Sequence, residues 1–297
     1  MITPEYLKVG DKIAIVAPAG KIAPDKVSMA KQTLESWGLV VEVGDHIFDS
    51  YFTYSSNDLN RINDFQKALD NKEIKAILCA RGGYGSIRII DKLDFSGFVK
   101  PLKWIIGFSD ITILHSHIHA NFNIETIHGI MAAGLDSNPS SSIDSLKQAL
   151  FGQTLNYEFD LSPLSRKGES KGMLVGGNLA ILCSLIASDS DIDIDGKVLF
   201  IEEIGEHLYR IDRMMWMLKR AGKLDKLAGL IVGGFTDIPD KDSEFGKTAY
   251  EIIAEAVNSY DYPVCYGFPA GHQEDNRTLI MGREVILEVS EKVKLQF

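Results

Sequence analysis

A serine with the surroundings of a nucleophile lies in the first half of the chain. Ser109 stands in the segment 104–111 (WIIGFSDI), where an apolar run stops at Gly107 and a helix is expected from Asp110. A strand-to-helix turn of this kind exposes a serine hydroxyl beside the free N–H groups of the helix start, which can stabilise an oxyanion. From these residues alone, a role for Ser109 as the cap of the helix is favoured over a nucleophile, and Ile111 departs from the GxSxG form.

A second feature is the glycine-rich segment 80–86 (ARGGYGS), again between an expected strand and an expected helix. Glycines let a ligand approach the backbone closely, with N–H groups directed at it. The segment lacks the Lys-Ser/Thr ending of a P-loop and the spacing of a dinucleotide fingerprint. A phosphate site, an oxyanion or carboxylate site and a plain turn are therefore all compatible with it.

Carboxylates and histidines suited to acid–base chemistry occur in the second half. Glu202 and Glu203 end an expected strand, and a carboxylate that emerges from an apolar strand can orient a histidine. His272 lies in the polar loop 269–276 (PAGHQEDN), the kind of segment that carries functional residues on a scaffold. His128, followed by a glycine, is a further candidate.

Two patterns imitate metal sites. Residues 191–202 match the calcium loop of an EF-hand, but the chain after Gly196 (KVLFIEE) is typical of a strand, whereas an EF-hand loop leads into a helix. We interpret this match as accidental. His115 and His119 share a face of an expected helix, but no carboxylate motif accompanies them, so a helix surface or core edge is favoured over a metal site. We predict no metal and no cofactor.

The elements that carry these residues alternate in the first half of the chain. Strands are expected at 12–18, 39–43, 74–80 and 103–108, and helices at 24–37, 58–69, 86–92 and from 110. Strands that alternate with helices favour a parallel sheet covered on both faces.

Residues 136–170 are rich in Ser, Pro and Gly, a composition typical of exposed connections. Beyond them we expect strands at 197–202, 227–235 and 284–289 and helices at 178–187, 208–221 and 246–258. The sequence therefore predicts an α/β domain over residues 1–150, a linker over 151–170 and a β-rich domain over 171–297.

Composition excludes several classes of partner. The 297 residues include 31 basic and 41 acidic ones, a formal charge of −10, which disfavours binding to nucleic acid or to anionic membranes. The three cysteines form no CxxC pair, which suits reduced thiols. The first residues do not resemble a signal peptide, so we expect a cytoplasmic protein.

Seven segments, in their order along the chain, together resemble the LD-carboxypeptidase (muramoyltetrapeptide carboxypeptidase) family of serine peptidases. They are GDKIAIVAPAG (10–20), ARGGYGS (80–86), IIGFSDIT (105–112), HG (128–129), GGN (176–178), KVLFIEEIGEHLYRIDRM (197–214) and GFPAGHQEDN (267–276). By this resemblance Ser109 is the nucleophile, Glu202 orients the histidine and His272 is the general base.

The resemblance also implies the groups that surround this triad. The backbone N–H groups of Gly83 and Asp110 would form the oxyanion hole, and Asn178 is a candidate substrate contact. Arg81 would supply local positive potential, since the expected substrate is itself anionic and the chain is acidic. Ile130 stands where the family commonly has proline, which affects a neighbouring loop and not the triad.

The family architecture would be an N-terminal flavodoxin-like, amidotransferase-like parallel-sheet domain and a smaller β-rich C-terminal domain. The reaction would be hydrolysis of the amide between an L-configured centre and a terminal D-amino acid. Typically this releases D-alanine from a murein tetrapeptide during peptidoglycan recycling in the cytoplasm, by a homodimer.

Two other functions are compatible with parts of the sequence. Related hydrolases give self-immunity by cleaving a peptidyl-nucleotide (microcin C-like) antibiotic, but they tend to be longer than these 297 residues. A flavodoxin-like domain can also serve as a non-catalytic binding protein, because fold alone does not give activity. Convergence of Ser109, Glu202 and His272 would favour the hydrolase.

Overall fold

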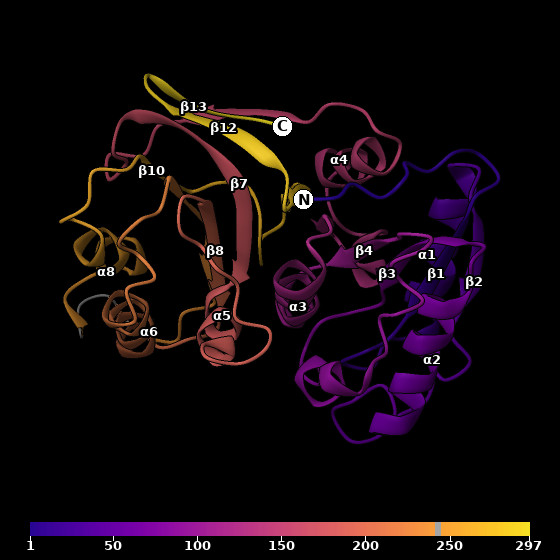
Figure 1. Cartoon of the computed structure of the whole chain (residues 1–297). Coiled ribbons are helices and arrows are strands. Elements are labelled where there is room, and N and C mark those ends of the chain that lie inside the picture. Colours follow the sequence, from indigo (N-terminus) through magenta and orange to yellow (C-terminus); the bar gives the residue numbers. More distant parts are fainter. Residues whose placement is uncertain (241–244) are drawn as a thin grey trace.

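The computed structural model describes residues 1–240 and 245–297, which form two β-sheets with helices packed against them (Figure 1). The first sheet has the strand order β11-β5-β4-β3-β1-β2. Its members are β1 (Lys12–Val16), β2 (Val40–Val43), β3 (Ile74–Cys79), β4 (Trp104–Gly107), β5 (Thr126–His128) and β11 (Leu279–Met281). All pair in parallel except β11, which is antiparallel to β5. The expected parallel α/β architecture is confirmed.

Three helices connect these strands: α1 (Pro24–Ser36), α2 (Asp58–Asp70) and α3 (Thr112–Phe122). Proline at the first position favours the start of α1, and the side chain of Asn57 caps α2. The helix expected over 86–92 is instead two short 3₁₀ turns, η1 (Ser86–Arg88) and η2 (Ile90–Lys92). Isoleucines crowd this short segment, and β-branched side chains weaken helix formation.

The second sheet has the order β10-β9-β8-β7-β12-β13-β6. Its strands are β6 (Asn156–Asp160), β7 (Gly168–Asn178), β8 (Val198–Ile204), β9 (Gly229–Thr236), β10 (Val264–Tyr266), β12 (Glu284–Val289) and β13 (Lys292–Gln296). Strands β7 to β10 are parallel, and β12, β13 and β6 continue the sheet in antiparallel pairing. The helices α5 (Leu179–Leu185), α6 (Leu208–Arg220) and α8 (Ala249–Ala256) pack on it.

The segment expected as an exposed connection is more ordered than its composition indicates. It holds α4 (Ser140–Leu150) and β6, and β7 begins inside it at Gly168. The apolar face of α4 is buried, and the hydroxyls of Ser142 and Ser145 accept hydrogen bonds from the backbone N–H groups of Asn276 and Thr278. Ser142 and Ser145, whose residue type is typical of loops, therefore connect α4 to the C-terminal part of the chain by hydrogen bonds.

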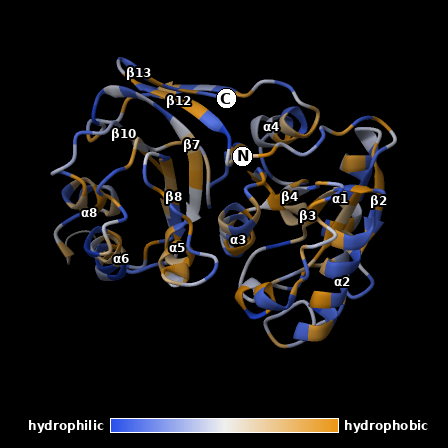
Figure 2. Cartoon of the chain, viewed as in Figure 1, coloured by the Kyte–Doolittle hydropathy of each residue, from blue (hydrophilic) through white to orange (hydrophobic). Residues whose placement is uncertain are grey.

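One hydrophobic cluster includes residues of both sheets. The largest buried cluster joins Trp104 and Ile127 of the first sheet to Phe200 and Leu287 of the second. Figure 2 shows hydrophobic and hydrophilic residues interspersed along the helices, as expected for helices with one buried face. Within residues 1–240 and 245–297, no helix combines the length and the apolar character needed to cross a membrane.

Candidate active site

Ser109 occupies a tight turn at the carboxyl end of β4. It opens the 3₁₀ turn η3 (Ser109–Ile111), which leads directly into α3. Its φ of 63° lies in the left-handed region, where a residue with a side chain is strained. A Cβ added to Gly82 would lie 2.9 Å from Cβ of Ser109, so the glycine-rich segment packs directly against this turn. Ser109 is half-buried, and it does not act as a helix cap, since no side chain caps η3 or α3.

Glu202 and His272 form a hydrogen-bonded pair opposite the serine turn. The fully buried Glu202 is in β8, and its Oε2 lies 2.6 Å from Nδ1 of His272 and also accepts the backbone N–H of His272 at 3.1 Å. Gly271, at a φ of 103°, allows this approach, because a Cβ there would lie 2.6 Å from Cβ of Glu202. The bond at Nδ1 leaves Nε2 as the nitrogen that can accept a proton.

The charge state of His272 follows from two opposed effects. Burial disfavours the imidazolium, but the hydrogen bond and negative charge of Glu202 outweigh it, so the pKa of His272 is raised above its ordinary value. The ring of His272 also contacts that of Phe108, with centroids 4.9 Å apart, which fixes the imidazole next to the residue that precedes Ser109.

Ser109 and His272 line the same open cavity of about 540 Å³ at the junction of the two halves of the chain. Its other lining residues are Arg81, Gly82, Gly83, Phe108, Met131, Ala133, Gly134, Ser137, Asn138 and Ile204. The structure thus brings the predicted nucleophile, the predicted base and the glycine-rich segment to one site.

Two backbone N–H groups near this cavity are candidates to bind an oxyanion. Gly83 lines the cavity with a φ of 107°, and Asp110 follows Ser109 in η3. Within the part of the chain that the structure describes, neither N–H donates to another protein group. Free N–H groups beside a serine are what stabilisation of a tetrahedral intermediate requires.

Comparison with known proteins agrees with this geometry. Residues 13–129 match the LD-carboxypeptidase N-terminal domain, and residues 171–287 match the LD-carboxypeptidase C-terminal domain. The chain is 35% identical over 294 residues to a probable murein peptide carboxypeptidase of Bacillus subtilis, covering 97% of this chain and 92% of the relative. The chain belongs to the LD-carboxypeptidase family.

Other members extend the comparison. The murein tetrapeptide carboxypeptidase of Pseudomonas aeruginosa is 30% identical, with 94% of each chain covered. The crystal structure of muramoyltetrapeptide carboxypeptidase from Oxalobacter formigenes aligns with a TM-score of 0.87 at 26% identity, covering 96% of this chain and 98% of that one. The microcin C7 self-immunity protein MccF of Escherichia coli is less similar, at 25% identity over 96% of this chain and 93% of its own length.

Asn178 is not among the residues that line the cavity. Its Oδ1 accepts the N–H of Ile181 as the cap of α5, and its Nδ2 donates to Oε1 of Glu203 at 2.8 Å. Its backbone N–H donates to Oγ1 of Thr112 at 3.0 Å. These bonds give Asn178 a structural role between β8 and α3, and its contact with a substrate stays a prediction.

The remaining histidine candidates are part of the core. His115 bonds through Nε2 to the carbonyl of Gly107, and His119 to Oγ1 of Thr126, so the two side chains have separate partners. Burial lowers the pKa of His115 to about 4 and that of His119 to about 3. His128 is buried between the rings of Phe108 and Phe200, and its pKa is also lowered by burial.

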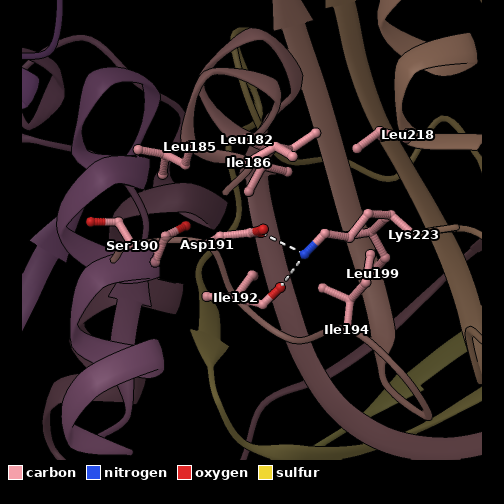
Figure 3. Close-up of a pocket in the computed structure, with 11 residues that line it drawn as sticks. Leu182, Leu185, Ile186, Ser190, Asp191, Ile192, Ile194, Leu199, Leu218 and Lys223 are labelled. Carbon is pink, nitrogen blue, oxygen red and sulfur yellow. Dashed lines mark hydrogen bonds and ion pairs between the residues drawn. The ribbon is translucent and has the colours of Figure 1, made fainter. Parts of the chain in front are cut away.

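The EF-hand-like segment continues into a strand, as its sequence indicates. Its last residue, Glu202, is engaged by His272. At its start, Nζ of Lys223 bonds to Oδ1 of Asp191 at 2.5 Å and to the carbonyl of Ile192 at 2.9 Å (Figure 3). These residues border an apolar pocket of about 20 Å³, and apolar side chains do not bind a cation.

Sequence reasoning assigned no supporting role to three residues that contact the elements of the site. Glu203 and Thr112 hold Asn178, and Arg61 lies beneath the glycine-rich segment. Only Glu203 carried a local signal, as the second carboxylate at the end of a strand. Thr112 and Arg61 resemble ordinary helix residues, because their partners come from distant parts of the chain.

Proposed function

We propose that the protein is a serine-type LD-carboxypeptidase that releases the terminal D-alanine of murein tetrapeptides. The observation that carries this proposal is the presence of Ser109 and of the Glu202-bound His272 at one cavity, in a chain of the LD-carboxypeptidase family. The names of the relatives supply the substrate class.

In the proposed mechanism Nε2 of His272 takes the proton of Ser109 as Oγ attacks the scissile carbonyl carbon. The N–H groups of Gly83 and Asp110 bind the oxyanion that develops, and Glu202 stabilises the imidazolium. His272 then protonates the leaving nitrogen, D-alanine departs, and a water molecule activated by His272 hydrolyses the acyl-enzyme to release the tripeptide.

The lining of the cavity suits an anionic substrate despite the acidic chain. Among the lining residues there is no carboxylate, and Arg81 is the one permanently charged side chain. A guanidinium binds a carboxylate through charge-assisted hydrogen bonds. We therefore assign recognition of the terminal carboxylate to Arg81.

The decisive test is digestion of a murein tetrapeptide followed by mass spectrometry. Wild-type protein should convert tetrapeptide to tripeptide plus D-alanine, and Ser109→Ala should abolish the conversion. Ser184→Ala, at an exposed hydroxyl on α5, is the matched control and should leave turnover unchanged. Turnover that persists in Ser109→Ala would contradict the assignment. Turnover of an aminoacyl-sulfamoyl adenosine in place of the tetrapeptide would favour the self-immunity function.

A second test addresses Arg81. Replacing it with alanine should raise KM for the tetrapeptide about 10- to 150-fold, since a charge-assisted hydrogen bond contributes about 1.5–3 kcal/mol, while Arg81→Lys should keep part of the affinity. A substrate that ends in D-alaninamide provides the control, because wild-type and variant should process it with similar KM. An unchanged KM for the free acid in Arg81→Ala would contradict the role.

The family relationship also leads us to propose a cytoplasmic homodimer. Sedimentation equilibrium should give twice the chain mass of 32.9 kDa, and cell fractionation should recover the protein with the cytosol. A monomer at micromolar concentration would contradict the first proposal, and recovery from the cell envelope the second.

A further inference from the structure

The side chain of Asp110 has a role that its position as an oxyanion donor does not explain. The residue is 1% exposed, and its Oδ2 accepts the backbone N–H of Ser86 at 2.8 Å. Ser86 is the last residue of the glycine-rich segment 80–86 that supplies Gly83. One hydrogen bond therefore connects the turn that carries Ser109 to the segment that carries the second oxyanion donor.

This carboxylate does not serve as a helix cap. The N-cap residues of η3 and α3 are Phe108 and Ile111, and neither makes a side-chain capping bond. Oδ1 of Asp110 has no hydrogen-bond partner within residues 1–240 and 245–297. Burial raises the pKa of Asp110, although the bond from Ser86 opposes this. A buried carboxyl group with an unpartnered oxygen costs stability, and such costs are typical of functional sites.

Other contacts hold the glycine-rich segment against the rest of the first sheet. The N–H of Gly20 donates to the carbonyl of Gly82 at 3.0 Å. The fully buried guanidinium of Arg61 donates to the carbonyl of Gly85 at 2.9 Å. These contacts fix the segment to the loop after β1 and to α2, whereas Asp110 fixes it to the nucleophile turn.

We propose that the Asp110 carboxylate is a positioning residue that sets the separation of the two oxyanion donors, the N–H of Gly83 and its own N–H. The inference rests on the proposed function, because it assigns these N–H groups to the oxyanion. Stabilisation of a developing charge requires donors that are already in place, and a displacement of about 1 Å costs about 100-fold in rate. Losing the Asp110–Ser86 bond frees the segment to move relative to Ser109.

The test compares Asp110→Ala with Asp110→Asn. The side-chain carbonyl of asparagine can still accept the N–H of Ser86, whereas alanine cannot. We expect Asp110→Ala to lower kcat by about 100-fold with KM changed less than about threefold, and Asp110→Asn to stay within about fivefold of wild-type kcat. Ser184→Ala again serves as the control.

Inhibition by a peptide boronate is the measurement that distinguishes positioning of the oxyanion donors from a purely structural role of Asp110. Oγ of Ser109 adds to boron and its proton passes to His272, so the tetrahedral adduct places an oxygen between the two donors. Asp110→Ala should weaken boronate inhibition by the same factor as kcat, while affinity for the tripeptide product stays unchanged.

The outcomes separate the inference from the proposed function. Equal boronate affinity in wild type and Asp110→Ala would overturn the inference, and so would inactivity of Asp110→Asn at an unchanged Tm, because the bond to Ser86 would then not be what matters. If Asp110→Ala fails to fold, a wild-type-like Asp110→Asn supports the inference. If the wild-type protein neither turns over tetrapeptide nor binds the boronate, the proposed function itself has failed.

Discussion

The hydrogen bond between Glu202 and His272 controls both the tautomer and the charge of the imidazole. With Nδ1 held by a buried carboxylate at 2.6 Å, the proton acceptor must be Nε2. Glu202 also holds the pKa of His272 above its ordinary value, although burial opposes this. We therefore expect the proposed general base to be protonated, and so inactive, at mildly acidic pH.

This arrangement predicts a pH profile. kcat/KM should fall as pH decreases through the raised pKa of His272, because the imidazolium cannot accept the serine proton. Glu202→Gln removes the negative charge, so the acidic limb should move to lower pH while kcat falls by at least about 100-fold. Glu158→Gln, in a surface ion pair with Lys292, is a charge-matched control and should leave the profile in place. An acidic limb that does not move in Glu202→Gln would contradict the coupling.

Part of the candidate site could be predicted from the local sequence around single residues, and part could not. Ser109 and His272 stand in local sequences typical of functional loops, and their roles followed from the family resemblance. For Asn178 the structure adds what the sequence did not indicate, since its side chain caps α5 and binds Glu203, while its contact with a substrate stays a prediction. These contacts depend on which way a residue at the end of β7 points, and sequence spacing does not determine that.

Among the elements, β8 and α3 must keep a fixed relative position. Strand β8 carries Glu202, and helix α3 directly follows the turn that carries Ser109. The contact runs from Glu203 through Asn178 to Thr112. Burial raises the pKa of Glu203 to about 7, and three N–H donors surround its carboxylate. A Cβ on Gly177 would lie 2.4 Å from Oγ1 of Thr112, so the elements also touch closely.

Thr112→Val tests this contact. Valine keeps the shape of threonine but leaves the N–H of Asn178 without its acceptor, which should cost about 1–3 kcal/mol of unfolding free energy. The shift between β8 and α3 should lower kcat by about 10- to 100-fold with a smaller change in KM. Urea titration and steady-state kinetics measure the two effects. Thr112→Ser retains the hydroxyl and should restore kcat, and equal kcat in valine and serine variants would refute the role.

Secondary structure was predictable where local periodicity decides it. Strands β1 to β4 and helices α1 and α2 lie close to their expected bounds. The expectations failed where distant contacts decide: α4 and β6 form in a serine-rich segment because each packs against the C-terminal part of the chain. The three-residue strand β11 has no periodicity to detect, and its partner β5 is about 150 residues away in the sequence.

For the whole molecule, β11 makes the two halves interdependent. Its residues 279–281 are buried and complete the first sheet beside β5, although they come from the end of the chain. Without them β5 would be an open edge strand, which is prone to non-native pairing. The two matched family domains therefore do not correspond to two independently closed sheets.

This interdependence predicts a single cooperative unfolding transition for the full chain in calorimetry. A fragment of residues 1–170 should aggregate or lack a cooperative transition, because β5 lacks its antiparallel neighbour. The same fragment with residues 276–283 attached through a flexible linker is the matched control and should regain cooperativity. Two well-separated transitions in the full chain would contradict the prediction.

The position of β11 in the sequence delays completion of the first sheet during synthesis. Ribosomes extend chains at about 5–20 residues per second, so roughly 8–30 seconds separate the emergence of β5 from that of β11. During that interval a nascent chain carries Ser109 without His272 and with an unfinished sheet. We therefore expect hydrolytic activity only after the proposed base His272 and strand β11 have both emerged, and none from a chain that stops before residue 272.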